Sequence, residues 1–311
     1  MAHRIVQGVT RFAGPVMVDD AVVAALDDLV GLAPLHQPPA LRVLADARAR
    51  FPSVPHVCCF DTAFHATLPE AEWRYPVPWE WAADWQVRRF GFHGLSVAWA
   101  VRRAAGLLGR DIDSLGLVVA HLGGGCSVTA VEGGRSVRTS MGYTPLEGLM
   151  MTTRSGSVDP GLLLRLLADG RLSVEALSDA LEHRSGLLGV SGVSADLREV
   201  EAAADSGDRR AALALDMFVA RTSAAIAAAA TALRRLDALV FTGGIGEHAG
   251  AVRASIVGRL GVLGMMPVPI DPPPGDLVLG EAGHGPPVVR IESREDLVMA
   301  LDAERLVRAR A

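Results

Sequence analysis

The chain has 311 residues, half of them hydrophobic, and its formal net charge is -5. A chain of this length favours about two domains, and its apolar content is enough for a large core without disulfides or metals. The negative charge argues against nucleic acid or a membrane surface as a partner.

The cysteines and the N-terminus indicate the compartment. Two of the three cysteines, Cys58 and Cys59, are adjacent within an apolar run, which is typical of core residues in a reducing environment. Met1 leads straight into a strand-like pattern without the charged and apolar regions of a signal peptide. The longest apolar stretch, residues 224–232, is too short to span a bilayer. We therefore expect a cytoplasmic protein.

In chain order, the residue patterns predict strands and helices that alternate. Strands are expected at residues 3–9, 54–60, 117–120, 127–131, 136–139, 238–242 and 288–292. Alternation on either side of Glu132-Gly133-Gly134 predicts a hairpin, and Arg184-Ser185-Gly186 predicts a turn. Helices are expected at residues 19–30, 38–50, 94–109, 160–168, 174–183, 195–204, 208–236, 251–260 and 294–310. Two long irregular loops are expected, an aromatic one at residues 64–85 and one rich in proline and glycine at 267–285.

A glycine run and an isolated arginine in the middle of the chain suggest a phosphate site. The predicted strand at residues 117–120 is followed directly by glycines at 123–125. Glycines leave room for backbone N–H groups to approach an anion. Arg154 then stands as a single cation between polar residues, before the next predicted helix.

Taken one at a time, the candidate residues also have plain structural interpretations. Residues 243–246 fit an ordinary strand–turn–helix connection. Asp61, at the end of a predicted strand, fits a loop cap as well as a functional carboxylate. Arg4 fits a surface charge on an edge strand, and His36 fits a packed turn residue.

The order of elements in the second half is three strands, then helices, then two strand–helix pairs. This is the topology of one half of the actin-like, ribonuclease-H-like phosphotransferase fold, an α/β fold with nucleotide bound between two such halves. The first half shows only strand, helices, strand and helix. We expect two domains, residues 1–95 with its opening strands absent and residues 96–311 with the nucleotide-binding loops.

Several motifs in a fixed order carry a resemblance to a known family. They are HRIV, APLHQPP, FDTAFHATLP, RRFGFHG, HLGGGCS, TSMGYTPLEGLMMTTRSGSVDP, LGVSGVSADLRE, FTGGIGE and ESREDLVMA. With them the chain resembles the acetate kinases of the acetokinase family, from His3 to the C-terminus. The resemblance implies reversible in-line transfer of the ATP γ-phosphoryl group to acetate, giving acetyl phosphate, with Mg²⁺ as cofactor. It also implies a homodimer built mainly through the second half.

The chemistry explains why arginines and histidines recur in these motifs. A carboxylate substrate needs no general base, so the site must hold two anions together, for which the arginine fork is suited. The resemblance places catalytic residues at Arg4, Asp61, His93, His121 and Arg154. It places the substrate pocket at Arg4, Val6, Leu35, Phe92 and Pro145, a third histidine at His36, and the carboxylate linked to Mg²⁺ at Glu295. Nucleotide contacts fall on His121, Gly123, Gly124, Gly125, Asp196, Leu197, Arg198, Gly243, Gly244, Ile245, Gly246 and His248.

The sequence also departs from the family pattern. Nothing before HRIV matches the family's opening strand, its Asn-Ala-Gly-Ser-Ser-Ser phosphate turn or the following strands, so we expect unpaired strand edges in the first half. Gly124 and His248 stand where the family has asparagines. Three interpretations stay open: an acetate kinase whose start is set too late, a truncated non-catalytic remnant, and a propionate or butyrate kinase.

Overall fold

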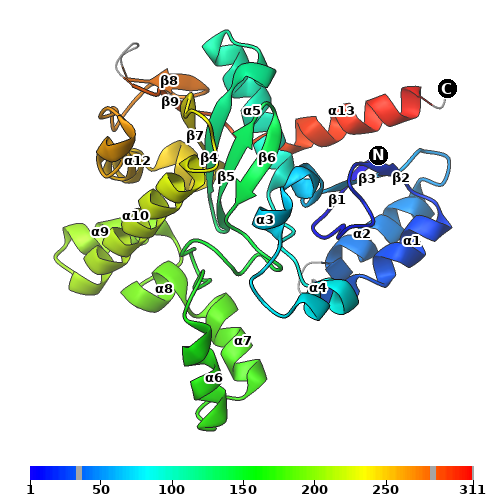
Figure 1. The fold of residues 1–311 in the computed structure, drawn as a ribbon, viewed down its shortest axis with the longest axis horizontal. Helices are drawn as coiled ribbons and strands as arrows, with labels where there is room; N and C mark the ends of the chain where they lie inside the picture. Colours follow the sequence, from blue (N-terminus) through cyan, green and yellow to red (C-terminus); the bar gives the residue numbers. More distant parts are fainter. Residues whose placement is uncertain (33–36, 281–284, 310–311) are drawn as a thin grey trace.

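The computed structural model describes residues 1–32, 37–280 and 285–309, and its strands form two sheets. The larger sheet has the strand order β6-β5-β4-β7-β9-β8 and lies in the middle of the molecule (Figure 1). The smaller sheet has the order β1-β3-β2 and lies to one side, at the N-terminus. The molecule is an α/β protein, as predicted.

The centre of the larger sheet is parallel, and its margins are antiparallel. The parallel strands are β4 (Gly116–Leu122), β7 (Ala238–Thr242) and β9 (Val288–Arg290). The antiparallel strands are β5 (Cys126–Glu132), β6 (Arg135–Thr139) and β8 (Leu277–Leu279). Gly133 and Gly134 close the β5–β6 hairpin with φ angles of 55° and 73°, which the mirror-image hairpin turns require. The predicted hairpin is therefore confirmed.

Helices cover both faces of the larger sheet. α5 (Gly94–Leu108) packs with Leu117 and Val119 of β4, and α10 (Arg209–Ala230) packs with the alternate residues Val118 and Ala120. Among the described residues, α10 is the one helix long and apolar enough, by length and composition alone, to cross a membrane. Its Phe218 and Ile226 are fully buried in the core beneath the sheet, so its apolar character is accounted for by packing.

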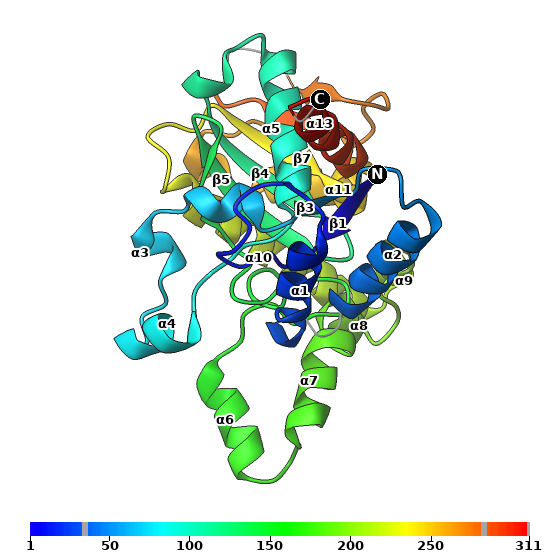
Figure 2. The same ribbon diagram turned by 90° about the vertical axis from the view of Figure 1, so that its right-hand side faces the viewer.

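The smaller sheet is covered by helices from both ends of the chain. Its strands are β1 (Ala2–Ile5), β2 (Val16–Met17) and β3 (Val57–Phe60). One face packs on α1 (Asp20–Asp27) and α2 (Gln37–Arg50), and the other packs on α13 (Glu295–Arg308). The last helix thus packs on the first sheet, as Figure 2 shows. The division into residues 1–95 and 96–311 stays a prediction.

Further helices connect these elements along the chain. They are α6 (Pro160–Ala168), α7 (Val174–His183), α8 (Gly186–Ser191), α9 (Leu197–Asp205), α11 (Gly243–His248) and α12 (Gly250–Gly258), with 3-10 turns η1 (Val30–Leu32), η3 (Ile112–Ser114) and η4 (Gly261–Leu263). Aspartate or serine caps several of them, for example Asp159 before α6 and Ser173 before α7. α6 and α7 project from the rest of the molecule in both views (Figures 1 and 2).

Several elements differ from the sequence prediction. Residues 64–85 are not an irregular loop but hold η2 (Ala63–Thr67), α3 (Glu70–Trp73) and α4 (Trp79–Trp85). Pro69 and Pro78 stand just before α3 and α4, where a proline favours a helix start instead of breaking it. The predicted turn at Gly186 is α8, and the predicted loop at 267–285 contains β8. β1 ends at Ile5, short of the predicted residue 9, where Val9 has a positive φ of 46° that a strand does not allow.

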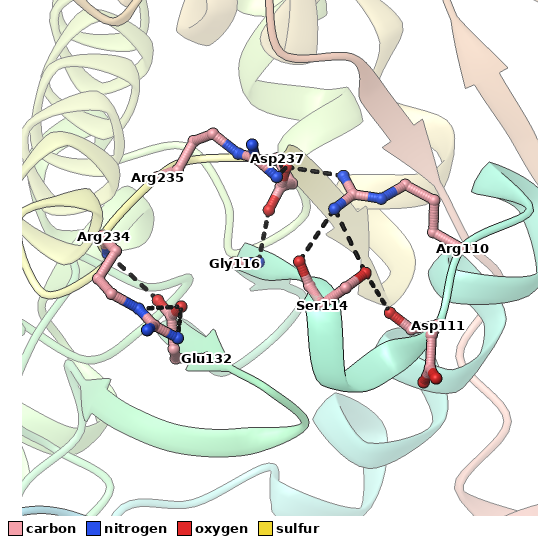
Figure 3. Close-up of polar contacts among 8 residues, drawn as sticks. All are labelled: Arg110, Asp111, Ser114, Gly116, Glu132, Arg234, Arg235 and Asp237. Carbon is pink, nitrogen blue, oxygen red and sulfur yellow. Dashed lines mark hydrogen bonds and ion pairs between the residues drawn. The ribbon is translucent and has the colours of Figure 1, made fainter.

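Polar contacts link the residues at the end of the larger sheet where β4 and β7 begin (Figure 3). Asp237 accepts hydrogen bonds from the Gly116 backbone N–H at 2.8 Å and from Arg110 Nη1 at 2.7 Å. Burial favours the protonated carboxyl, but these hydrogen bonds outweigh it and lower the pKa of Asp237. Glu132 accepts from Arg234, and Arg235 donates to Asp237. α10 ends at Ala230, short of the predicted residue 236, and these two arginines follow it outside the helix.

We predict that Asp237→Asn lowers the free energy of unfolding by about 1–2 kcal/mol, because charge-assisted hydrogen bonds become neutral ones and an amide cannot accept at both positions. Urea denaturation with an unchanged m-value would measure the loss. Asp113→Asn, a change at an exposed residue of η3, is the matched control. Equal stability of the two variants would contradict the prediction.

Candidate active site

The candidate site lies where strands of both sheets end. Arg4 lies on β1, Asp61 follows β3, and His121 lies near the end of β4. The carboxyl ends of parallel strands are the usual place for ligands in α/β proteins. A cavity of about 240 Å³ opens here. It is lined by seven of the residues singled out from the sequence: Arg4, Val6, Asp61, Phe92, His93, Pro145 and Arg154.

Two other predicted residues that the structure describes, His121 and Glu295, are not part of this lining. Leu35 and His36 lie outside the described residues. His121 does not line the smaller cavity, but its ring stacks on His93 with centroids 4.1 Å apart. The structure therefore brings the described catalytic candidates together, and their roles stay predictions.

Arg4 joins two carboxylates. Its Nη2 donates to Asp61 Oδ2 at 2.7 Å, and its Nη1 lies 3.0 Å from Glu295 Oε2. Burial disfavours the charge on Arg4, but the two carboxylates more than offset it and raise the pKa of Arg4. Burial raises the pKa of Glu295, against the opposing influence of Arg4. Arg4 is thus held charged and fixed in direction at the cavity wall.

Arg154 reaches the cavity from the segment between β6 and α6. Its Nη1 donates to the Pro145 carbonyl at 3.2 Å, and its Nε lies 3.4 Å from Glu182 Oε2 of α7. The sequence does not predict a role for Glu182, because no local spacing links it to Arg154, 28 positions earlier. Only the docking of α7 beside the loop brings the pair together, and it orients the arginine fork.

The two stacked histidines are neutral. His93 Nδ1 lies 3.0 Å from Ser127 Oγ, and His121 Nδ1 lies 2.8 Å from Ser96 Oγ. Burial, and then the nearby Arg4, lower the pKa of His121 to about 4. Burial and the neighbouring His121 lower the pKa of His93 well below its usual value. Neutral imidazoles can each donate one hydrogen bond to an anion without adding charge. Ser96 and Ser127 were not predicted, since isolated serines carry no sequence signal.

The buried histidines predict a stability that depends on pH. Burial also lowers the pKa of His65 to about 4, and this ring bonds Ser136 Oγ and the Phe92 carbonyl. The unfolded chain binds these protons below about pH 6.5, while the folded chain does not until about pH 4. Stability is therefore full above pH 6.5 and falls as the pH drops toward 4, by up to about 3 kcal/mol for each such histidine.

Guanidinium unfolding at pH 7.5, 6 and 5 would measure this fall. His65→Gln should flatten the dependence on pH, whereas the control His183→Gln, at an exposed position, should leave it unchanged. A free energy of unfolding that stays constant between pH 7.5 and 5 would contradict the prediction.

A second cavity of about 480 Å³ lies beside the glycine run at residues 123–125. Eight predicted nucleotide contacts line it: Gly123, Gly124, Asp196, Leu197, Arg198, Gly244, Ile245 and His248. Asp196 caps α9 and accepts from Arg198, and these hydrogen bonds lower the pKa of Asp196 to about 2. Thr152, Ala195, Glu201 and Ala249 also line the cavity and were not predicted.

Four predicted nucleotide residues do not line this cavity: His121, Gly125, Gly243 and Gly246. Gly243 has a φ of 78°, and a Cβ there would lie 2.7 Å from the Leu122 carbonyl oxygen. Only glycine allows this approach of α11 to β4. A structural reason for Gly243 is therefore present, and its contact with nucleotide stays a prediction.

The residues present suit a phosphate-bound magnesium ion better than an all-protein site. Among the described residues no group of three or more histidine, cysteine or acidic side chains is arranged to hold a metal. Asp61 and Glu295 both form ion pairs with Arg4, so their two carboxylates lie on the same guanidinium group. Mg²⁺ is usually held by one or two carboxylates together with substrate phosphates and water. Such a site matches the predicted role of Glu295.

Known proteins resemble the chain in sequence. The family model described as the acetokinase family matches residues 1–300. The acetate kinase of Deinococcus radiodurans is 46% identical over 316 residues, an alignment covering all of this chain and 79% of that protein.

Solved structures resemble it in fold. The acetate kinase of Porphyromonas gingivalis matches with a TM-score of 0.92 and 36% identity, over 98% of this chain and 77% of that one. The propionate kinase of Francisella tularensis matches with a TM-score of 0.91 and 36% identity, over 97% of this chain and 78% of that one. The predicted actin-like phosphotransferase fold is confirmed by these likenesses, and the chain belongs to the acetokinase family.

Proposed function

We propose that the chain is an ATP-dependent kinase that phosphorylates acetate reversibly to acetyl phosphate. The observation that carries this proposal is that one glycine run lies beside both cavities. Gly123 and Gly124 line the larger cavity, and a Cβ on Gly125 would lie 3.2 Å from His93 Nε2, which lines the smaller one. ATP in the larger cavity would direct its terminal phosphate across these glycines toward the smaller cavity.

The smaller cavity suits a short carboxylate. Val6, Phe92 and Pro145 offer an apolar wall for a methyl group, and two arginines offer charge to the carboxylate and phosphoryl oxygens. A carboxylate oxygen attacks the γ-phosphorus, and the bond from that phosphorus to the bridging oxygen breaks, so that ADP leaves with the electron pair. Acetate is already an anion and needs no base. Arg154 and neutral His93 then donate to the transferring group as it carries its charge.

We propose that Asp61 and Glu295 hold Mg²⁺ together with the nucleotide phosphates. When bound, the ion neutralises charge on the β- and γ-phosphate oxygens. Arg4 keeps both carboxylates in place, and its own charge limits their mutual repulsion. Glu295→Gln should raise the Mg²⁺ concentration needed for half-maximal nucleotide binding in calorimetric titrations, whereas Glu292→Gln, a change at an exposed neighbour, should not. Equal Mg²⁺ dependence in both variants would count against this site.

The test of the function is acyl phosphate formation by the purified chain with ATP and Mg²⁺, trapped with hydroxylamine as the hydroxamate. Acetate, propionate and butyrate should be compared, because both acetate and propionate kinases are among the structures that resemble this chain. We expect the highest kcat/KM with acetate. If the unchanged chain forms no more hydroxamate than an Arg154→Ala preparation from the same host, the proposal is contradicted.

We propose further that the chain forms a homodimer and that α6 lies in the interface. α6 carries five leucines, and none of its residues is buried. Leu162 and Leu164 are 51% and 68% exposed, on a hairpin that projects from the molecule (Figures 1 and 2). An exposed apolar helix of this kind is typical of an association surface. A second copy of the chain offers the same surface, which suits a two-fold contact.

Light scattering coupled to size-exclusion chromatography would test the dimer. The double change Leu162→Glu with Leu164→Glu should give a monomer, and Val43→Glu, at an exposed position on α2, should leave the dimer intact. A monomeric unchanged chain, or a dimeric double variant, would contradict the assignment of α6.

We propose that the chain acts in the cytoplasm, where ATP is supplied. Cys58, Cys59 and Cys126 are free and buried, which suits a reducing compartment. Fractionation of the producing cells should recover the chain with soluble cytoplasmic proteins. Recovery with membranes or in the medium would contradict the location.

A further inference from the structure

A network of hydrogen-bonded polar residues lies behind His121, on the face of the larger sheet that α5 covers. Leu117 and Val119 pack with α5, so His121, two positions further along β4, falls on the same face. Ser96, in the first turn of α5, is fully buried against it. Neither the cavity of about 240 Å³ nor that of about 480 Å³ has Ser96, Ser293 or Glu247 in its lining.

The hydrogen bonds of this network run from α11 to His121. Glu247 Oε1 accepts from the Ser293 backbone N–H at 2.9 Å. Ser293 Oγ lies 3.3 Å from Ser96 Oγ, which lies 2.8 Å from His121 Nδ1. The segment that leads to Glu295 is thereby tied to α11 on one side and to His121 on the other.

The hydrogen bonds of this network can run in two directions. In the first, Ser293 donates to Ser96 and Ser96 donates to His121 Nδ1, which leaves the ring proton on His121 Nε2. In the reverse direction His121 Nδ1 donates to Ser96 and Ser96 donates to Ser293, so Nε2 carries a lone pair and the partly exposed Ser293 hydroxyl holds the proton without a partner in this network. Both directions make the same number of hydrogen bonds, so the surroundings of Nε2 decide between them.

The second ring nitrogen faces the glycine run. A Cβ on Gly123 would lie 3.7 Å from His121 Nε2, and Gly123 lines the larger cavity. A proton on Nε2 therefore points toward the place where the phosphates of the proposed nucleotide lie. A lone pair there would repel a phosphate oxygen.

We propose that Ser96 is a positioning residue that, supported by Ser293, holds His121 as the tautomer with its proton on Nε2. The inference rests on the proposed function, because the phosphate expected beside Gly123 is what favours a proton on Nε2, but the tautomer is measured without activity. Ser96 touches no reacting atom and acts through the orientation of the imidazole and the position of its proton.

Nitrogen-15 NMR of histidine-labelled protein would test the tautomer directly. The chemical shifts of the two ring nitrogens, assigned with a His121→Gln variant, distinguish a protonated nitrogen from an acceptor. In the unchanged chain we expect protonated Nε2 and acceptor Nδ1. In Ser96→Ala we expect exchange between the two tautomers. Protonated Nδ1 in the unchanged chain, or an unchanged spectrum in Ser96→Ala, would overturn the proposal.

Kinetics provide a second readout. Ser96→Ala should lower kcat about tenfold or more and leave KM for ATP and acetate within about twofold, because only transition-state donation is lost. Ser223→Ala is the matched control, since that buried hydroxyl on α10 bonds the Val219 and Ile256 carbonyls. A kcat for Ser96→Ala equal to that of Ser223→Ala would overturn the kinetic role. If the unchanged chain forms no acyl phosphate, the proposed function fails while the NMR result still decides the tautomer.

Discussion

Arg154→Ala is expected to lower kcat for acyl phosphate formation by at least about a thousandfold. Of the two arginines at the cavity, Arg4 is bound to both Asp61 and Glu295, whereas Arg154 has one carboxylate at 3.4 Å. Its Nη1 bonds only the Pro145 carbonyl and a sulfur among the described contacts, so N–H donors remain for the phosphoryl oxygens. Removing the guanidinium leaves that developing charge without its main partner.

Two further variants separate charge from geometry in this prediction. Arg154→Lys keeps the charge but loses the planar fork, and should recover only a small part of the rate. Arg308→Ala, at an exposed ion pair with Glu304 on α13, is the control and should leave kcat unchanged. A thermal unfolding midpoint for Arg154→Ala within a few degrees of the unchanged chain would show that folding is intact. A kcat within tenfold of the unchanged chain would contradict the role of Arg154.

Arg253→Met is expected to lower the free energy of unfolding by about 2–4 kcal/mol and to weaken nucleotide binding. Arg253 is fully buried on α12, and its Nη1 donates to the Gly246 and Glu247 carbonyls at 2.9 and 2.8 Å. Burial, and then nearby Arg290, lower the pKa of Arg253, so the charge is held at a cost. Methionine would relieve that cost, but it would remove the arginine donor from one buried and one partly buried backbone carbonyl at the end of α11. We expect the lost hydrogen bonds to outweigh the relief.

The effect on nucleotide follows from the position of α11. Gly244, Ile245 and His248 of this helix line the larger cavity, so loosening its end should raise KM for ATP more than KM for acetate. Arg259→Met, at an exposed pair with Asp216 just after α12, is the matched control. Chemical denaturation and initial-rate kinetics would measure both effects. An Arg253→Met variant as stable as Arg259→Met would contradict the prediction, because it would show that burying the charge costs at least as much as its hydrogen bonds contribute.

Prediction from sequence succeeded where local patterns dominate. The hairpin around Gly133 and Gly134 was found because alternation and turn chemistry are properties of neighbouring residues. The helices in residues 64–85 were missed because prolines and aromatic residues were read as loop signals, while Pro69 and Pro78 stand at helix starts. The glycine at 243 was read as a nucleotide contact, although its close packing against Leu122 also requires it.

The sequence by itself determined the family, the α/β class, the residues that line the smaller cavity and most of those that line the larger one, because long ordered motifs keep their residue types where chemistry requires them. Only the tertiary structure decided how those residues are paired. Glu182 beside Arg154, Glu295 on Arg4, and Ser96 with Ser293, which are 197 positions apart, meet through the alignment of strands and helices. Such pairs are set by packing, and burial then decides that His93 and His121 are neutral, so no local pattern in the sequence encodes them.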